Sequence, residues 1–131
     1  MFLMDSMSKI FKLGEARKVE APGISTTYMV VDKEMGALKM MALVYDYEPN
    51  LDLKKVHYHV NRESAYLILE GEARLHLNGE NHVVGPGTFV YLSPGDVHGV
   101  IGTGGKGLKY LEFWAPQDKD VVYLEEGVTK K

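Results

Sequence analysis

Residues 57–71 read HYHVNRESAYLILEG, and this stretch determines the fold that we predict for the chain. It begins with His57 and His59, which one residue separates, and continues into an apolar run that ends at Gly71. Alternate side chains of a β-strand point to the same face, so the two histidines would lie on one face, about 7 Å apart along the strand. Two imidazoles placed in this way can bind one metal ion.

The sequence around this stretch predicts short strands separated by turns. Asn78-Gly79 is typical of the type I′ turn of a β-hairpin, and we interpret the glycine run at 102–107 as a loop between strands. No segment has a sustained helical period, so the pattern favours an all-β sandwich or barrel. β-branched, aromatic and alternating residues predict strands at 26–31, 38–47, 64–69, 73–77, 88–92 and 108–114, with an edge strand at 121–124.

Composition limits the class of protein further. The 131 residues, 45% of them hydrophobic, suffice for one domain with a hydrophobic core. The absence of cysteine excludes disulfides and thiolate chemistry, so any metal must be held by histidine, carboxylate or water. The net charge of −3 and the scattered basic residues give no nucleic-acid footprint. The N-terminal sequence has no charged leader and no long apolar run, so we expect a cytoplasmic protein without a membrane partner.

Two motifs resemble the signatures of the cupin superfamily. The first is His57, His59, Glu63 and Gly71, and the second runs from Gly85 through the segment SPGDVH at 93–98. The resemblance implies an all-β jelly-roll barrel, also called a double-stranded β-helix, in a single cupin domain. We therefore divide the chain into an N-terminal arm at 1–25 and a cupin β-barrel domain at 26–131, with the motifs at 57–71 and 85–102.

The same resemblance implies a metal site formed by His57, His59, Glu63 and His98. The cofactor would be one divalent transition metal, namely Fe, Mn, Ni, Cu or Zn, because three imidazoles and a carboxylate suit each of these ions. If Glu63 does not coordinate the metal, it is a candidate general base beside it. The other histidines, His76 and His82, are interpreted as surface or structural residues.

The carboxylate ligand has two alternatives. Seven residues separate Glu63 from Gly71, where the family pattern has six, so an alignment that starts from the glycine places Ser64 at the ligand position. Either Glu63 points inward, or Ser64, Tyr66 and Ile68 do. Both faces of the run are largely apolar, so alternation leaves the choice open. Two smaller departures are Ser93 at the usual proline position and Gly102 in place of the trailing asparagine.

The resemblance also implies a function. A cupin pocket next to a metal suits an enzyme of the dioxygenase or isomerase type that acts on a small oxygenated metabolite, and the alternative is a non-catalytic cupin that binds a small ligand. We expect Arg62 to be a solvated loop residue, and we expect a homodimer, because small cupins often pair through sheet edges. The aromatic candidates for the substrate pocket are Tyr45, Tyr66, Tyr91 and Phe113.

Overall fold

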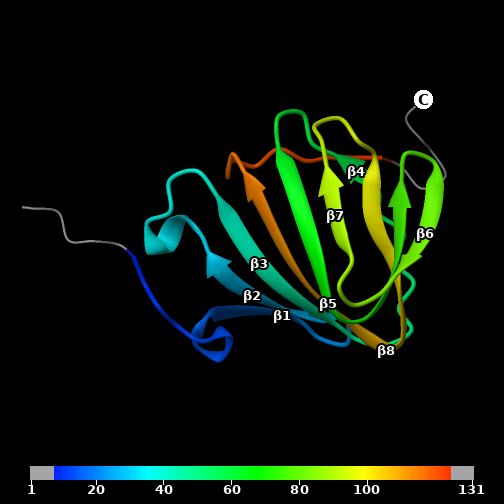
Figure 1. The fold of residues 1–131 in the computed structure, drawn as a ribbon, viewed down its shortest axis with the longest axis horizontal. Helices are drawn as coiled ribbons and strands as arrows, with labels where there is room; N and C mark the ends of the chain where they lie inside the picture. Colours follow the sequence, from blue (N-terminus) through cyan, green and yellow to red (C-terminus); the bar gives the residue numbers. More distant parts are fainter. Residues whose placement is uncertain (1–7, 125–131) are drawn as a thin grey trace, which may run out of the picture.

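The computed structural model describes residues 8–124, and these form a chain built almost entirely of β-strands (Figure 1). Two single-turn 3-10 helices, η1 (Leu13–Glu15) and η2 (Lys33–Met35), interrupt the strands. Neither of these helices, nor any other part of 8–124, forms a helix long and apolar enough to cross a membrane. The strands are β1 (Arg17–Ala21), β2 (Ser25–Val31), β3 (Met41–Tyr47), β4 (His57–Tyr58), β5 (Glu63–Leu77), β6 (Glu80–Val84), β7 (Phe89–Leu92), β8 (His98–Ala115) and β9 (Val122–Tyr123).

Two long antiparallel strands, β5 and β8, carry the architecture. The first half of β5 pairs with β7 and with the second half of β8, which continues into β3, β2 and β1. The second half of β5 pairs with β6 and with the first half of β8, whose first residue pairs with β4, which in turn pairs with β9. The two halves form the two layers of a jelly roll, which confirms the all-β prediction.

Close backbone contact allows β5 and β8 to bend between these layers. Gly71 has a φ of +77°, and a Cβ on it would lie 2.1 Å from the carbonyl oxygen of Gly107. The ladder shifts register between Gly71 and Ala73. We predicted two strands, 64–69 and 73–77, where the structure has one bent strand. The predicted loop at 102–107 is wrong for the same reason, because these residues continue β8 through the bend.

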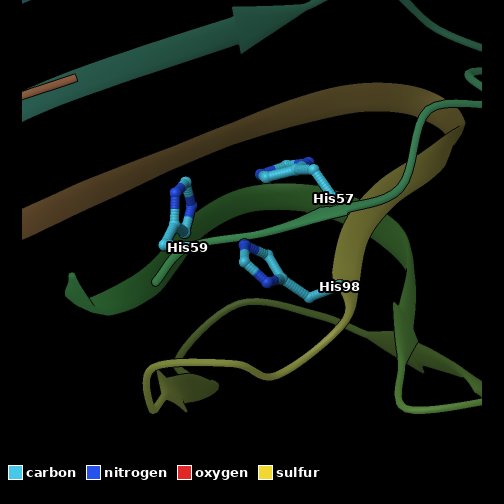
Figure 2. A group of neighbouring side chains, drawn as sticks. All are labelled: His57, His59 and His98. Atoms are coloured by element: carbon cyan, nitrogen blue, oxygen red, sulfur yellow. The ribbon is translucent and has the colours of Figure 1, made fainter. Parts of the chain in front are cut away.

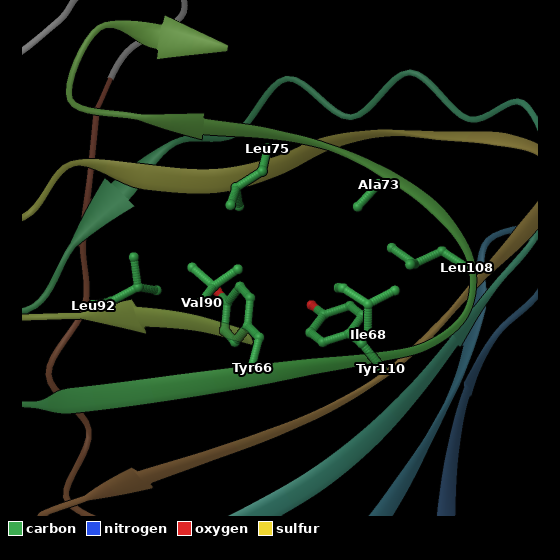
Figure 3. Close-up of a cluster of buried hydrophobic side chains, with 8 residues drawn as sticks. All are labelled: Tyr66, Ile68, Ala73, Leu75, Val90, Leu92, Leu108 and Tyr110. Carbon is green, nitrogen blue, oxygen red and sulfur yellow. The ribbon is translucent and has the colours of Figure 1, made fainter. Parts of the chain in front are cut away.

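The bend of β5 encloses the hydrophobic core. Figure 3 shows β5 curving so that Tyr66 and Ile68 on its first half face Ala73 and Leu75 on its second half. Ile68 is 2% exposed, which corresponds to about 1.5–3 kcal/mol of favourable burial. The cluster consists of Tyr66, Ile68, Ala73, Leu75, Val90, Leu92, Leu108 and Tyr110.

The β5–β6 hairpin and the N-terminal arm can be compared with what the sequence predicted. Asn78 and Gly79 both have positive φ, and Leu77 pairs with Glu80 across the turn, which confirms the predicted β5–β6 hairpin. Within the predicted arm at 1–25, the segment 17–21 forms β1 and pairs with β2. Residues 1–7 lie outside the described part of the chain.

Candidate functional site: a three-histidine cluster beside a tyrosine-lined cavity

Three histidines from two adjacent strands meet at one point. His57 on β4 pairs with His98 at the start of β8, and His59 follows β4 on the same face. Their ring centroids lie 4.4 Å apart for His57 and His98, 5.0 Å for His57 and His59, and 5.1 Å for His59 and His98. One nitrogen from each ring lies within 4.8 Å of the others. The rings converge, as Figure 2 shows.

Backbone carbonyls fix the orientation of two of these rings. Nδ1 of His59 donates a hydrogen bond to the carbonyl of Asp120, and Nδ1 of His98 donates to the carbonyl of Asp96 at 2.9 Å. A carbonyl can only accept, so Nε2 of each ring keeps its lone pair. This arrangement is the one that metal-binding histidines use in proteins.

Burial keeps the imidazoles neutral. It lowers the pKa of His57 to about 3, with the neighbouring charges of His98 and His59 acting in the same direction, and it lowers the pKa of His98 to about 4. Burial also lowers the pKa of His59, against the opposing effect of its hydrogen bond to Asp120. Nδ1 of His57 and Nε2 of His98 are buried and have no hydrogen-bond partner among the described residues. Neutral imidazoles with unused buried nitrogens fit a divalent transition metal.

The structure corrects the fourth predicted ligand. Glu63 is exposed on the outer face of β5, where its carboxylate accepts a hydrogen bond of 2.7 Å from Tyr91. Ser64 is 3% exposed and shares the inward face with Tyr66 and Ile68. Of the two alternatives, the one with Ser64 inside is therefore correct. The extra residue before Gly71 puts Glu63 on the outer face of β5. From there its carboxylate can act neither as a metal ligand nor as a base in the site.

A cavity of about 480 Å³ adjoins the histidines. His57 and His59 lie in its wall, together with five tyrosines and Trp114. Tyr45 and Tyr66 line it as predicted, whereas Tyr91 and Phe113 do not, because they are 60% and 39% exposed on the outer face. Tyr91 alternates with the buried Val90 and Leu92, and Phe113 alternates with the buried Glu112 and Trp114.

Glu112 is a cavity residue that the sequence did not reveal. It is 7% exposed on the inward face of β8, between Tyr110 and Trp114, and it lines the cavity. Burial raises the pKa of its carboxyl to about 7, although the charge of Arg62 and a hydrogen bond with Tyr45 act to lower it. The sequence signal that could have found Glu112 is its alternation with Tyr110 and Trp114, which places all three on the same face of the strand. A buried carboxyl that titrates near neutral pH in a cavity is typical of a functional site.

Arg62 is the second cavity residue that the sequence did not reveal. We expected it to be a solvated loop residue, and that expectation is wrong. Its side chain is buried at the cavity wall, and its guanidinium lies 4.4 Å from the centroid of the Trp114 ring. Nη2 donates a hydrogen bond to the carbonyl of Asp118 at 3.2 Å. No local pattern marks it, because its partners lie more than fifty residues away in the sequence.

Asp120 joins the segment after β8 to the cluster. Its carboxylate accepts hydrogen bonds from the backbone N–H groups of Val60, Asn61 and Arg62 at 2.9, 2.6 and 3.1 Å. Its carbonyl accepts the hydrogen bond from His59. One residue therefore holds both the loop after β4 and the ring of His59.

The motifs and the geometry agree with a comparison of sequences. The family model described as "Cupin domain" matches residues 43–114, which include all three histidines. The chain belongs to the cupin family. No curated protein sequence matches this cupin.

Solved structures share the fold of this cupin. The polyketide cyclase RemF from Streptomyces resistomycificus is 24% identical, with a TM-score of 0.73, over 95% of this chain and 89% of that chain. A conserved protein with a double-stranded β-helix domain from Klebsiella pneumoniae is 22% identical, with a TM-score of 0.72, over 91% of this chain and 99% of that chain. The nucleoside dehydratase Pac13 from Streptomyces is 16% identical, with a TM-score of 0.66, over 91% of this chain and 92% of that chain. At these identities the likeness concerns the fold alone.

Proposed function

We propose that this cupin is a metal-dependent enzyme that acts on a small oxygenated metabolite, of the isomerase or dioxygenase type. The observation that carries the proposal is a cluster of three neutral imidazoles, of which His57 and His98 have buried nitrogens without a partner and His57 and His59 lie in the wall of a cavity. Two of the structural neighbours are described as enzymes that act on small molecules, a cyclase and a dehydratase. These descriptions apply to the neighbouring proteins themselves, and they support the proposal that this cupin is also an enzyme.

His57, His59 and His98 would hold the metal. When bound, a divalent metal ion supplies Lewis-acid polarisation of a substrate oxygen, or redox chemistry when the ion is iron, manganese or copper. The imidazoles contribute no charge of their own, since burial keeps them neutral. The positive charge of the ion is therefore left for substrate oxygens.

Glu112 provides proton transfer in the same cavity. With a pKa of about 7, its carboxyl can release or accept a proton at neutral pH, which is the property of an efficient general acid or base. Burial raises the pKa of Tyr45 well above its usual value, so its hydroxyl stays protonated beside Glu112. Tyr66 and Tyr110 are buried in the wall and exclude water. The presence of a proton carrier favours the isomerase type over the dioxygenase type.

Metal analysis tests the proposal. Protein treated with a chelator and then reconstituted separately with Fe(II), Mn(II), Ni(II), Cu(II) and Zn(II) should bind about one equivalent of at least one ion, measured by mass spectrometry after gel filtration. His57→Ala and His98→Ala should lose this binding. The matched control His82→Ala should keep it, because His82 is exposed and lies beside Glu80 rather than near the cluster. Wild-type protein that binds none of the five ions would contradict the proposal.

Two activity assays then separate the reaction types. Exchange of carbon-bound protons of hydroxy and keto compounds with D₂O, followed by NMR, would support an isomerase-type reaction. Consumption of O₂ with diketones or catechols in the presence of Fe(II) would support a dioxygenase. Metal binding without either activity over a broad panel would favour the non-catalytic alternative.

A further inference from the structure

Arg62 is held rigidly at the cavity wall. Its side chain is 7% exposed, with the guanidinium over the ring of Trp114 and Nη2 bonded to the carbonyl of Asp118. Its backbone N–H donates to the carboxylate of Asp120. A guanidinium fixed by stacking and by a backbone carbonyl loses little further freedom when it binds a ligand.

The guanidinium nevertheless forms no direct ion pair within residues 8–124, although the carboxylates of Glu112 and Asp120 are near enough to act on its charge. Nε is buried and makes no hydrogen bond to any described residue. None of the ion pairs within residues 8–124 involves Arg62. The carboxylate of Asp120, although close, is used by three backbone N–H groups. A buried cation without an ion pair is costly to fold, so its presence in a cavity wall needs a reason.

The cavity itself favours an anion. The chain carries a net charge of −3, but the charged residues among the described part of the lining are Lys54, Lys55 and Arg62 against Asp52 and Glu112. Glu112 is partly protonated at neutral pH, which leaves the lining more positive still. The aromatic walls add apolar area for the body of a small ligand. The formal charge of the lining is thus opposite in sign to the charge of the whole chain.

We propose that the ligand of this cavity is a small organic acid whose carboxylate binds the guanidinium of Arg62. The inference rests on the proposed function in taking this cavity as the substrate site, and it adds the class of substrate. A planar carboxylate matches the parallel N–H groups of a guanidinium, which an ammonium does not offer. Arg62 is then a substrate-binding residue, and two histidines of the proposed metal site, His57 and His59, lie in the wall of the same cavity.

A matched pair of probes tests the inference. Benzoate and benzamide have the same size and aromatic body, and they differ in charge. Trp114 is the only tryptophan of the chain and lies against the guanidinium, so its fluorescence reports directly on a ligand at Arg62. We expect benzoate to change this fluorescence with an affinity at least about tenfold higher than that of benzamide, the range of a charge-assisted hydrogen bond.

Variants assign the preference to Arg62. Arg62→Gln should abolish the preference for benzoate. Arg62→Lys keeps the positive charge but lacks the parallel N–H groups of the guanidinium, so it should reduce the preference. The control Arg17→Gln should keep it, because Arg17 lies on β1 and pairs with Asp32 and Glu34. Circular dichroism checks that each variant is folded. Equal affinity for the two probes, or a preference that survives in folded Arg62→Gln, would overturn the inference.

The same titration in His98→Ala protein separates this inference from the metal proposal. If Arg62 binds the carboxylate, the preference for benzoate persists in this variant, whether or not the wild-type protein binds a metal. If the preference disappears in His98→Ala and survives in Arg62→Gln, the carboxylate binds a metal instead, and the inference is wrong.

Discussion

At the scale of single residues, Glu112 shows how the site departs from what stability alone favours. It alternates with Tyr110 and Trp114 on the inward face of β8, where an apolar side chain would remove the cost of burying a carboxylate. A hydrogen bond with Tyr45 and the charge of Arg62 lower its pKa only in part. A position that carries such a cost in a cavity wall is a candidate for a chemical role.

Replacement of Glu112 by glutamine should therefore change how stability depends on pH. The carboxyl has a pKa of about 7 in the folded chain against 4.5 as the ordinary value, so between these pH values the folded state binds more protons than the unfolded state. Stability then falls as the pH rises from 4.5 to 7 and stays lower above it, by about 3 kcal/mol at about 1.4 kcal/mol per pKa unit.

Urea unfolding at several pH values between 4.5 and 8 measures this difference. The free energy of unfolding of Glu112→Gln minus that of wild type should increase over this range and then stay constant. Subtraction removes the contributions of the histidines, which both proteins share. A difference that does not vary with pH would show that the carboxyl titrates normally in the folded protein.

The residues of the site were predictable only where local sequence carries the signal. His57, His59 and His98 follow from two motifs with fixed spacing, and the structure brings them together. The choice between Glu63 and Ser64 could not be made, because the strand is apolar on both faces and one added residue reverses every side chain after it. Tyr91 and Phe113 were misplaced for the same reason, since an aromatic residue suits either face of a strand.

At the scale of elements, turn chemistry was predictable and bends were not. Asn78-Gly79 specifies a tight hairpin because both residues adopt positive φ. The glycine run at 102–107 has the composition of a loop, yet it lies in a strand, because Gly102 and Thr103 pair with β5. At Gly102 the neighbouring Arg74 side chain fills the space that a Cβ would need. Glycines that permit close approach and glycines that permit flexibility look alike in a single sequence.

The segment after β8 is an element whose role in the site can be tested. The family match ends at residue 114, but Asp120 beyond it orients His59 and caps the loop at 60–62. Asp120→Ala keeps the carbonyl and removes the carboxylate that positions it. We expect metal affinity to fall by about tenfold, the lower end of the effect of residues that orient metal ligands.

Competition with a fluorescent chelator measures this affinity. Asp118→Ala is the matched control, because Asp118 lies in the same segment and its exposed carboxylate pairs with Lys33 at 3.6 Å on the surface. Its carbonyl, which accepts from Arg62, is retained in that variant. Equal affinities in the two variants would show that the carboxylate of Asp120 does not position His59.

At the scale of the whole molecule, the three histidines join β4 and the residue that follows it to the start of β8. β4 has two residues, and it meets β8 through the single pair formed by His57 and His98. Its other partner is the equally short β9. The long β5–β8 pair and the core behind it are much more extensive. The cavity wall at β4 therefore has fewer paired residues than the β5–β8 layer, although residues 51–53 before it also bond to β8, and a ligand there should add to stability.

A metal ion bound by the three histidines would tie β4 to β8, and it should stabilise the entire domain. An ion that binds only the folded chain, present at 100 times its dissociation constant, adds about 2.7 kcal/mol. For a domain of this size that corresponds to a rise of roughly 10 °C in the melting temperature. Differential scanning calorimetry of chelator-treated protein, with and without the ion identified by metal analysis, measures the rise. His98→Ala should show almost none of it, because the ligand from β8 is lost while His57 on β4 and His59 after it remain. A rise of equal size in that variant would mean that the ion stabilises the protein from another site, and the link between β4 and β8 would then depend on their backbone pairing alone.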